Sequence, residues 1–212
     1  MMRKLSSVLL GLSIISCGRG GDEMSRYHED GRAKPVIAIA SMIDTTSFEC
    51  PWSVSEELTS MISSQIGQSS EIFVNAKEEF AFTENPFGAD LSWVKREFSN
   101  HEFVVFLELV EHENAPAEKD KKAVQAFEVS TNINMAIRIR VLDLRGSTPK
   151  VVLQELVRSS YYVPKTLLPI DYNEIVWGSE EYETTPMGIA HAELVAEVVS
   201  RLSDYILLAK SR

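Results

Sequence analysis

The stretch that decides the fold is residues 127–163, FEVSTNINMAIRIRVLDLRGSTPKVVLQELVRSSYYV. Apolar or β-branched residues occupy every second position from Val129 to Val141. This is the period of a β-strand with one buried face and one face in water. Turn residues (RGSTP) follow, and a second β-rich run begins at Lys150. We therefore predict a long antiparallel hairpin over 127–163 at the centre of a sheet.

Two strands and a helix before the hairpin predict a βαβ unit. Pro35–Ala40 is a short, wholly apolar run, typical of a strand buried on both faces. Ser53–Glu56 reads SVSE, a capping box that opens an amphipathic helix, which we expect to end at Gly67. Glu71–Asn75 supplies the second strand. A strand, a helix and a strand of these lengths favour a parallel pair of strands.

The remaining segments predict one sheet covered by helices. We expect two short helices, from Asn75 and from Asp90, then a third strand, His101–Val110, and a charged loop at 111–122. After the hairpin, a long irregular connection, Leu167–Thr185, leads to a final helix. The element order is β-α-β-α-α-β-β-β-α. It predicts an α/β (α+β) domain, a mixed β-sheet with helices packed on it.

Several of these segments resemble one known group of proteins. They are the strands VIAI (36–39), IFVN (72–75) and EFVVFL (102–107), the first capped helix, and the hairpin with Asp143 and Gly146 at its tip. Together they are similar to the periplasmic domains of the LpoB, CsgG and TolB N-terminal type. The resemblance covers residues 35–163 and the last helix, and residues 164–184 depart from it. It implies an envelope protein, often a lipoprotein, that works by binding other proteins.

The beginning of the chain has the layout of a secretory signal. Arg3 and Lys4 precede an apolar run, residues 8–15, that is too short to stay in a membrane as a spanning helix. Residues 14–17, IISC, resemble a bacterial lipobox. The resemblance implies cleavage before Cys17, a diacylglycerol on its thiol and an acyl chain such as palmitate on its new amine. The alternative is a short N-terminal membrane helix with an incidental cysteine.

The residues after the lipobox predict where the protein lies. Gly18 stands where an aspartate usually means retention at the inner membrane, so the resemblance implies an outer-membrane lipoprotein facing the periplasm. Residues 17–34 are rich in glycine and charge, as in a flexible tether. We therefore predict a lipoprotein signal peptide at 1–16, a tether at 17–34 that starts at lipidated Cys17, and a single globular envelope domain at 35–212.

The chain is acidic. Its net charge of −10 becomes −12 once residues 1–16 are removed, because that segment holds Arg3 and Lys4 and no acid. Such a charge argues against nucleic-acid binding and against electrostatic adhesion to anionic lipid. Cys50 is the only cysteine besides Cys17, so a lipidated chain has no pair for an internal disulfide. Since no base lies near Cys50 in the sequence, we expect an inert thiol there.

No sequence motif assigns a reaction. The chain lacks a glycine-rich phosphate loop with lysine, a HExxH motif, a paired-cysteine motif and a GxSxG motif. His-Glu pairs start at His28, His101 and His112, and we interpret them as chance neighbours because adjacent residues on a strand point apart. His191 lies on the apolar stripe of the last helix, which predicts a core histidine with one satisfied nitrogen. We expect no catalytic residue, no metal, no cofactor apart from the lipid on Cys17, and no small-molecule substrate.

Three function classes remain open. The first is a lipid-anchored, non-catalytic module that recruits, activates or scaffolds an envelope protein. The predicted membrane location, the tether and the resemblance favour this class. The second is an envelope hydrolase whose site is assembled from loop carboxylates and histidines. A cleft with two carboxylates, or with a histidine–carboxylate pair of shifted pKa, would favour it. The third is a pore or secretion-channel subunit whose hairpin crosses the membrane.

The connection Leu167–Thr185 is where we expect the partner protein to dock. It carries Tyr172, Trp177 and Tyr182. Five acidic residues surround them: Asp171, Glu174, Glu180, Glu181 and Glu183. Aromatic side chains anchor interfaces, and an acidic surround steers a basic partner. The alternative is that the three rings simply hold a long loop against the domain.

Overall fold

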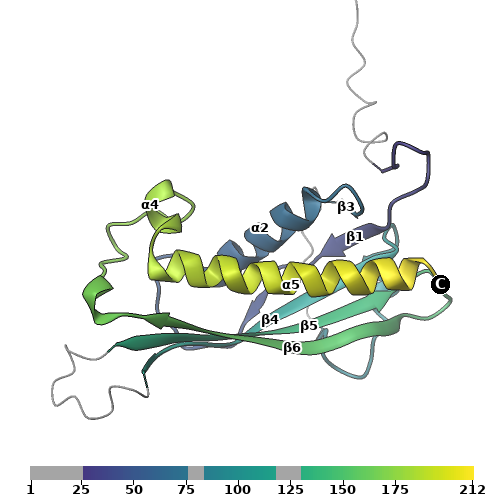
Figure 1. The fold of residues 1–212 in the computed structure, drawn as a ribbon. Coiled ribbons are helices and arrows are strands. Elements are labelled where there is room, and N and C mark those ends of the chain that lie inside the picture. Colours follow the sequence, from purple (N-terminus) through teal and green to yellow (C-terminus); the bar gives the residue numbers. More distant parts are fainter. Residues whose placement is uncertain (1–25, 76–83, 118–129) are drawn as a thin grey trace, which may run out of the picture.

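The computed structural model describes residues 26–75, 84–117 and 130–212. Its centre is a six-stranded mixed sheet in the order β3-β1-β4-β5-β6, with β2 paired to β4 beside this path (Figure 1). The strands are β1 (Val36–Ile39), β2 (Ile43–Asp44), β3 (Phe73–Val74), β4 (Phe103–Pro116), β5 (Thr131–Asp143) and β6 (Lys150–Val163). The helices are α2 (Val54–Gly67), α3 (Val94–Glu97), α4 (Glu180–Glu183) and α5 (Pro186–Lys210), with a 3-10 turn, η3, at Lys165–Leu167.

The predicted fold class is confirmed, and so are its two main units. β1 precedes α2 in the chain and β3 follows it, and the two strands pair in parallel, which is the expected βαβ unit. β5 and β6 pair antiparallel from Thr131 opposite Val163 to Asp143 opposite Lys150. The predicted signal peptide, Cys17, the first half of the predicted tether (17–25), the helix expected from Asn75 and the first residues of the predicted hairpin lie outside the described residues.

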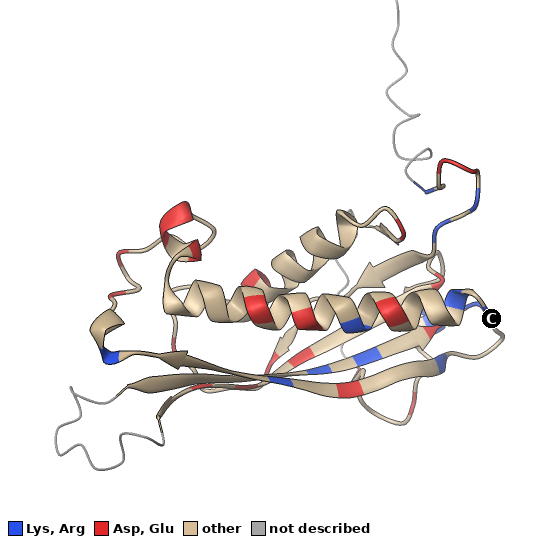
Figure 2. Cartoon of the chain, viewed as in Figure 1, with Lys and Arg blue, Asp and Glu red and all other residues tan. Residues whose placement is uncertain are grey.

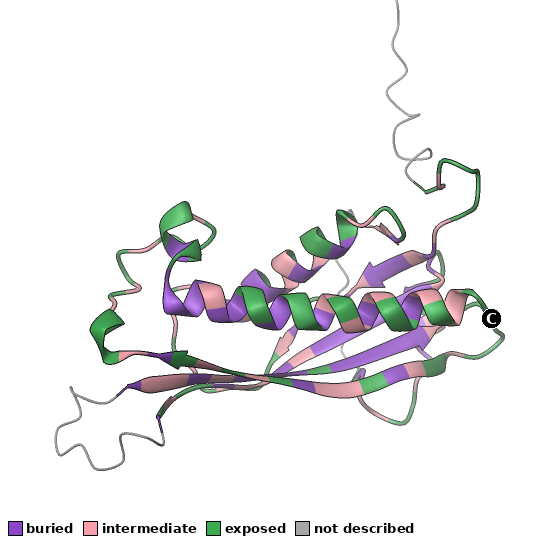
Figure 3. Cartoon of the chain, in the orientation of Figure 1, coloured by how far each residue is buried: buried purple, intermediate pink, exposed green. Residues whose placement is uncertain are grey.

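The main core lies between the sheet and the two long helices, α2 and α5. β5 contributes alternate residues to it, each at most 4% exposed: Ile133, Met135, Ile137, Ile139 and Val141. α5 runs along this face of the sheet in Figure 1, and buried and exposed residues alternate along it in Figure 3. The apolar face of β5, which its period-two pattern predicts, packs against the apolar stripe of α5, because each of these surfaces must be covered by the other.

The opposite face of β5 was predicted to lie in water. This is correct for Arg138, which is exposed, but wrong for Ala136 and Arg140, which are 0% and 8% exposed, and Leu142 beyond them is fully buried. A smaller apolar cluster covers this face, built on Trp93, Phe98 and Phe106. The guanidinium of Arg140 is satisfied there because it donates to the carbonyl oxygens of Pro86 (2.9 Å) and Gly88 (2.8 Å) and to Gln154. The segment that covers this face was predicted as helix from Asp90, but its helical part, α3, is shorter.

Backbone pairing also changes a predicted loop. The charged loop expected at 111–122 is wrong for residues 111–116, because β4 continues to Pro116 and pairs with β5 beyond a bulge between Leu109 and Glu111. The segment between β1 and α2, where we predicted no element, contains the short strand β2, which is parallel to β4. Within the described residues, no helix combines the length and apolarity needed to cross a membrane.

Candidate functional site

The predicted docking residues lie at one end of the molecule, in the connection between β6 and α5 (Figure 1). Trp177 is 39% exposed, and its neighbour Val176 is 73% exposed. Tyr172 is half-buried, and its hydroxyl accepts a hydrogen bond from the backbone amide of Met187 at 3.4 Å. Tyr182 is 3% exposed. The structure therefore leaves Trp177 partly exposed and places Tyr182 in the core, where we had expected both on the docking surface.

Local sequence explains how this end is built. Ser179 caps α4 by accepting from the amide of Tyr182 (3.2 Å), and Thr185 caps α5 by accepting from the amide of Gly188 (3.0 Å). Gly178 has a φ of +77°, a conformation that favours glycine, in the turn before α4. A Cβ at Gly188 would lie 2.2 Å from the carbonyl oxygen of Tyr182. Only glycine there lets α4 pack so closely on α5.

A cavity of about 370 Å³ opens at this end, among α2, α4 and α5. Its apolar lining includes Met61 from α2, Ala192 from α5 and the indole of Trp177. Glu183 also lines it, and α4 is marked as acidic in Figure 2. Glu57 and Tyr182 belong to its inner wall. The cavity is of the size that holds a small ligand or a side chain from a partner, and its rim is negatively charged.

A buried polar network lies behind that inner wall. Glu57 of α2 is fully buried and accepts from three groups: the hydroxyl of Tyr182 (2.5 Å), the indole nitrogen of Trp52 (2.7 Å) and Nδ1 of His191 (2.9 Å). Nε2 of His191 lies 2.8 Å from Nε2 of His112. The network thus joins α2, α4, α5, β4 and the loop before α2, so each polar group has partners that offset the cost of its burial.

One arrangement of protons satisfies these distances. Glu57 is ionised and accepts from Nδ1–H of His191, which leaves Nε2 of His191 as an acceptor. His112 then donates through its own Nε2–H. Nδ1 of His112 has no hydrogen-bond partner among the described residues, as suits an unprotonated ring nitrogen.

The pKa values follow from this geometry. Burial, together with the nearby His191, lowers the pKa of His112 from 6.5 to about 4. Burial raises the pKa of Glu57, but the hydrogen bonds from His191, Tyr182 and Trp52 outweigh it, so the net shift of this pKa is downward. Burial and the bond to Glu57 raise the pKa of Tyr182 well above its usual value. All three groups are therefore held in the charge state that the network requires at neutral pH.

Sequence reasoning placed His191 in the core but missed its partners. His191 is fully buried, as expected, and both of its nitrogens have hydrogen-bond partners instead of one. His112 was taken as a chance neighbour of Glu113 in a loop, whereas it lies on β4 and is 4% exposed. Glu57 was not singled out. The available signal was its position on the apolar stripe of α2, three residues after Val54.

The network includes a buried histidine–carboxylate pair, the arrangement that the hydrolase alternative requires. Both oxygens of Glu57 and both nitrogens of His191 are occupied by internal partners. Cys50 is half-buried, and burial raises the pKa of its thiol, which disfavours the reactive thiolate. Among the described residues, no group of three histidine, cysteine or acidic side chains is placed to hold a metal ion. The network therefore links α2, α4, α5 and β4 beneath the cavity.

Comparisons with solved structures identify proteins of similar fold. The protein CT253 from Chlamydia trachomatis is similar to this chain with a TM-score of 0.66 and 24% identity, over 82% of this chain and 98% of that one. The protein XCC0632 from Xanthomonas campestris has a TM-score of 0.46 and 9% identity, over 84% and 87% of the two chains. A minor lipoprotein from Acinetobacter baumannii has a TM-score of 0.41 and 5% identity, over 81% and 92%. The likeness to CT253 shows the fold.

The sequence itself was compared with curated proteins and with family models. No curated protein matches it. One family model matches residues 23–210, nearly the whole chain after the predicted signal peptide, and its description is "Family of unknown function (DUF7499)". The protein therefore belongs to the family DUF7499.

Proposed function

We propose that the protein is a lipid-anchored, non-catalytic envelope lipoprotein that binds a basic partner protein at the α4 end of its domain. One observation carries the proposal: Trp177 lines an apolar cavity of about 370 Å³ that also has Glu183 on its wall. A partially exposed tryptophan beside a cavity is a common form of interface anchor. The cavity offers a place for an apolar stem or an aromatic ring of the partner, between Met61 and Ala192.

The charge of this end supports a basic partner. α4 carries Glu180, Glu181 and Glu183, and its first turn holds no base. Acidic residues around a hydrophobic anchor speed association with a basic surface and disfavour acidic competitors. The same negative charges repel nucleic acid and other polyanions, which are therefore poor ligands for this end of the domain. A lysine or arginine side chain of the partner fits both features, because its stem is apolar and its head is cationic.

The lipid anchor rests on the lipobox-like residues before Cys17. We expect the purified membrane form to start at Cys17, with an intact mass that lacks residues 1–16 and includes added acyl chains. Cys17→Ala is expected to abolish the acyl mass and release the protein from membranes, because stable anchoring needs two or more chains. Unmodified full-length protein in the membrane fraction would contradict this prediction. Fractionation of inner and outer membranes then tests the outer-membrane location.

The docking prediction is tested by Trp177→Ala. Crosslinking pull-down from intact envelopes identifies the partner, and its affinity is then measured for purified variants. We expect the substitution to weaken binding by about 30-fold, a typical loss at an interface tryptophan. The melting temperature should stay within about a degree, since Trp177 is 39% exposed and loses few core contacts. Glu183→Lys is expected to slow association, and more so at low salt.

Tyr27→Ala is the matched control, because Tyr27 is a 53% exposed aromatic residue in the N-terminal part of the described chain. It should leave binding unchanged. A lowered melting temperature for Trp177→Ala with intact partner binding would show that the connection is only structural.

A further inference from the structure

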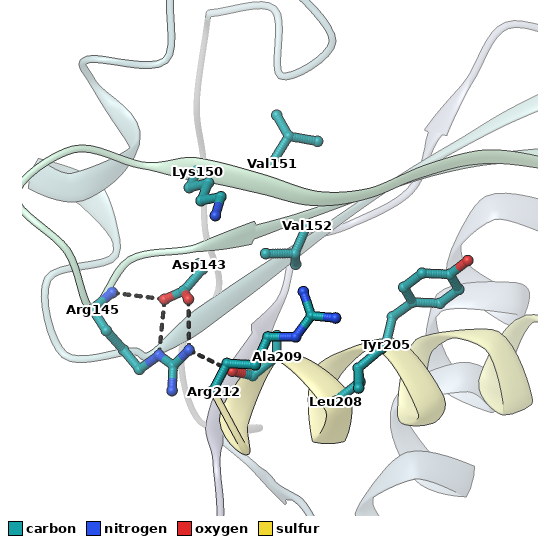
Figure 4. Close-up of a pocket in the computed structure, with 9 residues that line it drawn as sticks. All are labelled: Asp143, Arg145, Lys150, Val151, Val152, Tyr205, Leu208, Ala209 and Arg212. Carbon is teal, nitrogen blue, oxygen red and sulfur yellow. Dashed lines mark hydrogen bonds and ion pairs between the residues drawn. The ribbon is translucent and has the colours of Figure 1, made fainter.

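A second cleft lies at the other end of the molecule from Trp177, between the β5–β6 turn and the last turns of α5 (Figure 4). Its volume is about 280 Å³. Three of its lining residues are cations: Arg145, Lys150 and Arg212. Three others are large apolar residues that remain exposed: Val151 (40%), Tyr205 (39%) and Leu208 (50%). The cleft therefore combines positive charge with accessible apolar surface.

The side chains of its lining carry a net positive charge after internal pairing. Asp143 is the one acidic side chain in the lining, and it is bound by Arg145 at 2.7 Å. Arg145 also donates to the carbonyl oxygen of Ala209 at 2.7 Å, so it caps the end of α5 and is held in place (Figure 4). Lys150 and Arg212 are exposed and make no ion pair with other described residues. These two cations are available to an external anion.

The cleft also lies close to the point where the chain enters the domain. The amide of Glu102 donates to the carbonyl of Val36 at the start of β1 (2.9 Å), and the amide of Leu144 donates to the carbonyl of Glu102 (2.8 Å). The carboxylate of Glu102 binds Lys210 of α5 at 2.7 Å. The first residue of β1, the β5–β6 turn and the end of α5 are therefore neighbours. Figure 1 shows the N-terminal segment and the C-terminus at the same end.

A short chain separates this end from the predicted anchor. Arg26, the first described residue, is bonded through its carbonyl to the amide of Lys34 (2.9 Å), just before β1. Nine residues lead from Cys17 to Arg26. Fully extended, they span at most about 30 Å. If Cys17 is lipidated, this end of the domain is the end held at the membrane, and the Trp177 end is directed away from it.

We propose that this cleft is the membrane-facing surface of the domain and binds the phosphate groups of anionic lipid headgroups. Lys150 and Arg212 contact the phosphates, while Leu208, Tyr205 and Val151 enter the interfacial layer, as exposed apolar and aromatic side chains do at a lipid surface. The inference rests on the lipid anchor of the proposed function. The anchor is needed because two cations bind a membrane weakly unless the chain is already held beside it.

The net charge of −12 predicted adhesion to anionic lipid to be unfavourable. Figure 2 shows acidic segments at both ends of the domain, and those of α4 lie at the opposite end from the last turn of α5, which lines the cleft. Charges farther apart than about 10 Å are largely screened at physiological ionic strength. The cations of the cleft therefore act locally, whereas the acids near Trp177 face the proposed partner.

The test uses the mature lipidated protein reconstituted on vesicles of phosphatidylcholine, with or without phosphatidylglycerol. Hydrogen exchange is measured by mass spectrometry in peptides covering 143–152 and 205–212. We expect exchange there to slow several-fold on the anionic vesicles only, and the difference to disappear at high salt. The double variant Lys150→Glu/Arg212→Glu should remove the slowing. Arg158→Glu/Lys165→Glu, the same charge change at exposed positions outside the cleft, should keep it.

The outcomes separate the cleft from the anchor. Co-sedimentation with neutral vesicles reports the anchor by itself, and a chain that stays in solution overturns the anchor and the cleft proposal together. A chain that sediments but exchanges equally on both vesicle types overturns only the cleft proposal. Slowed exchange in intact envelopes without any slowing on anionic vesicles would assign the cleft to an acidic protein and would also overturn it.

Discussion

Ile137→Asp is expected to lower the free energy of unfolding by about 5 kcal/mol, enough to unfold most small domains. Ile137 is fully buried at the centre of β5, in the core between the sheet and the two long helices. The substitution removes an aliphatic side chain, which costs about 2–5 kcal/mol in a packed core. It also leaves a carboxyl group without a hydrogen-bond partner, so that group must be buried as an unpaired acid. Chemical unfolding followed by circular dichroism measures the loss.

Arg138→Gln, one position along the strand, is the control. Arg138 is exposed, and within the described residues its side chain contacts Glu108, at 3.0 Å, and the ring of Phe87. Loss of a partly exposed ion pair costs under about 1 kcal/mol. The two substituted residues are neighbours in the sequence, but their side chains lie on opposite faces of the sheet. Equal losses of stability would contradict the assignment of the two faces.

The second large effect is a loss of stability in acid that depends on His112. The pKa of His112 is about 4 in the folded protein, against 6.5 for an ordinary histidine. As the pH falls from 6.5 towards 4, the unfolded chain takes up a proton that the folded chain does not, so stability decreases. His112 alone accounts for about 3 kcal/mol over this window. Below it, protonation of Glu57, whose folded pKa is lowered from 4.5, removes further stability.

His112→Gln separates this effect from general acid denaturation. Glutamine can still donate to Nε2 of His191 but does not titrate. Urea unfolding curves at several pH values should therefore show a flatter pH dependence for the variant than for the wild type between pH 6.5 and 4. His28→Gln, at a half-buried position outside the network, should keep the wild-type slope. If His112→Gln keeps that slope too, the acid sensitivity arises at other groups.

Much of the fold was accessible from the sequence because hydrophobic periodicity is local. The alternation of β5, the stripe of α5 and the cap at Ser53 each depend on residues a few positions apart. These patterns predicted the hairpin, the βαβ unit and the final helix. The length of β4 could not be predicted from periodicity. Its charged end has no apolar alternation of its own and forms a strand because it pairs with β5. A bulge at Leu109/Glu111 also changes which residues face the core, and that turns His112 inward.

By itself, the sequence determined the layered α/β architecture. It also predicted the location of the protein from the lipobox-like residues and placed Trp177 among acidic residues. These depend on order and spacing along the chain. Only the tertiary structure decided which polar residues meet. Glu57 and His191 are 134 positions apart, and His112 and His191 are 79 apart. No spacing rule connects such residues, because they come into contact only when α2 and α5 pack on the sheet. The same packing places the cavity beside Trp177 and the cleft beside Arg212 at opposite ends of the domain.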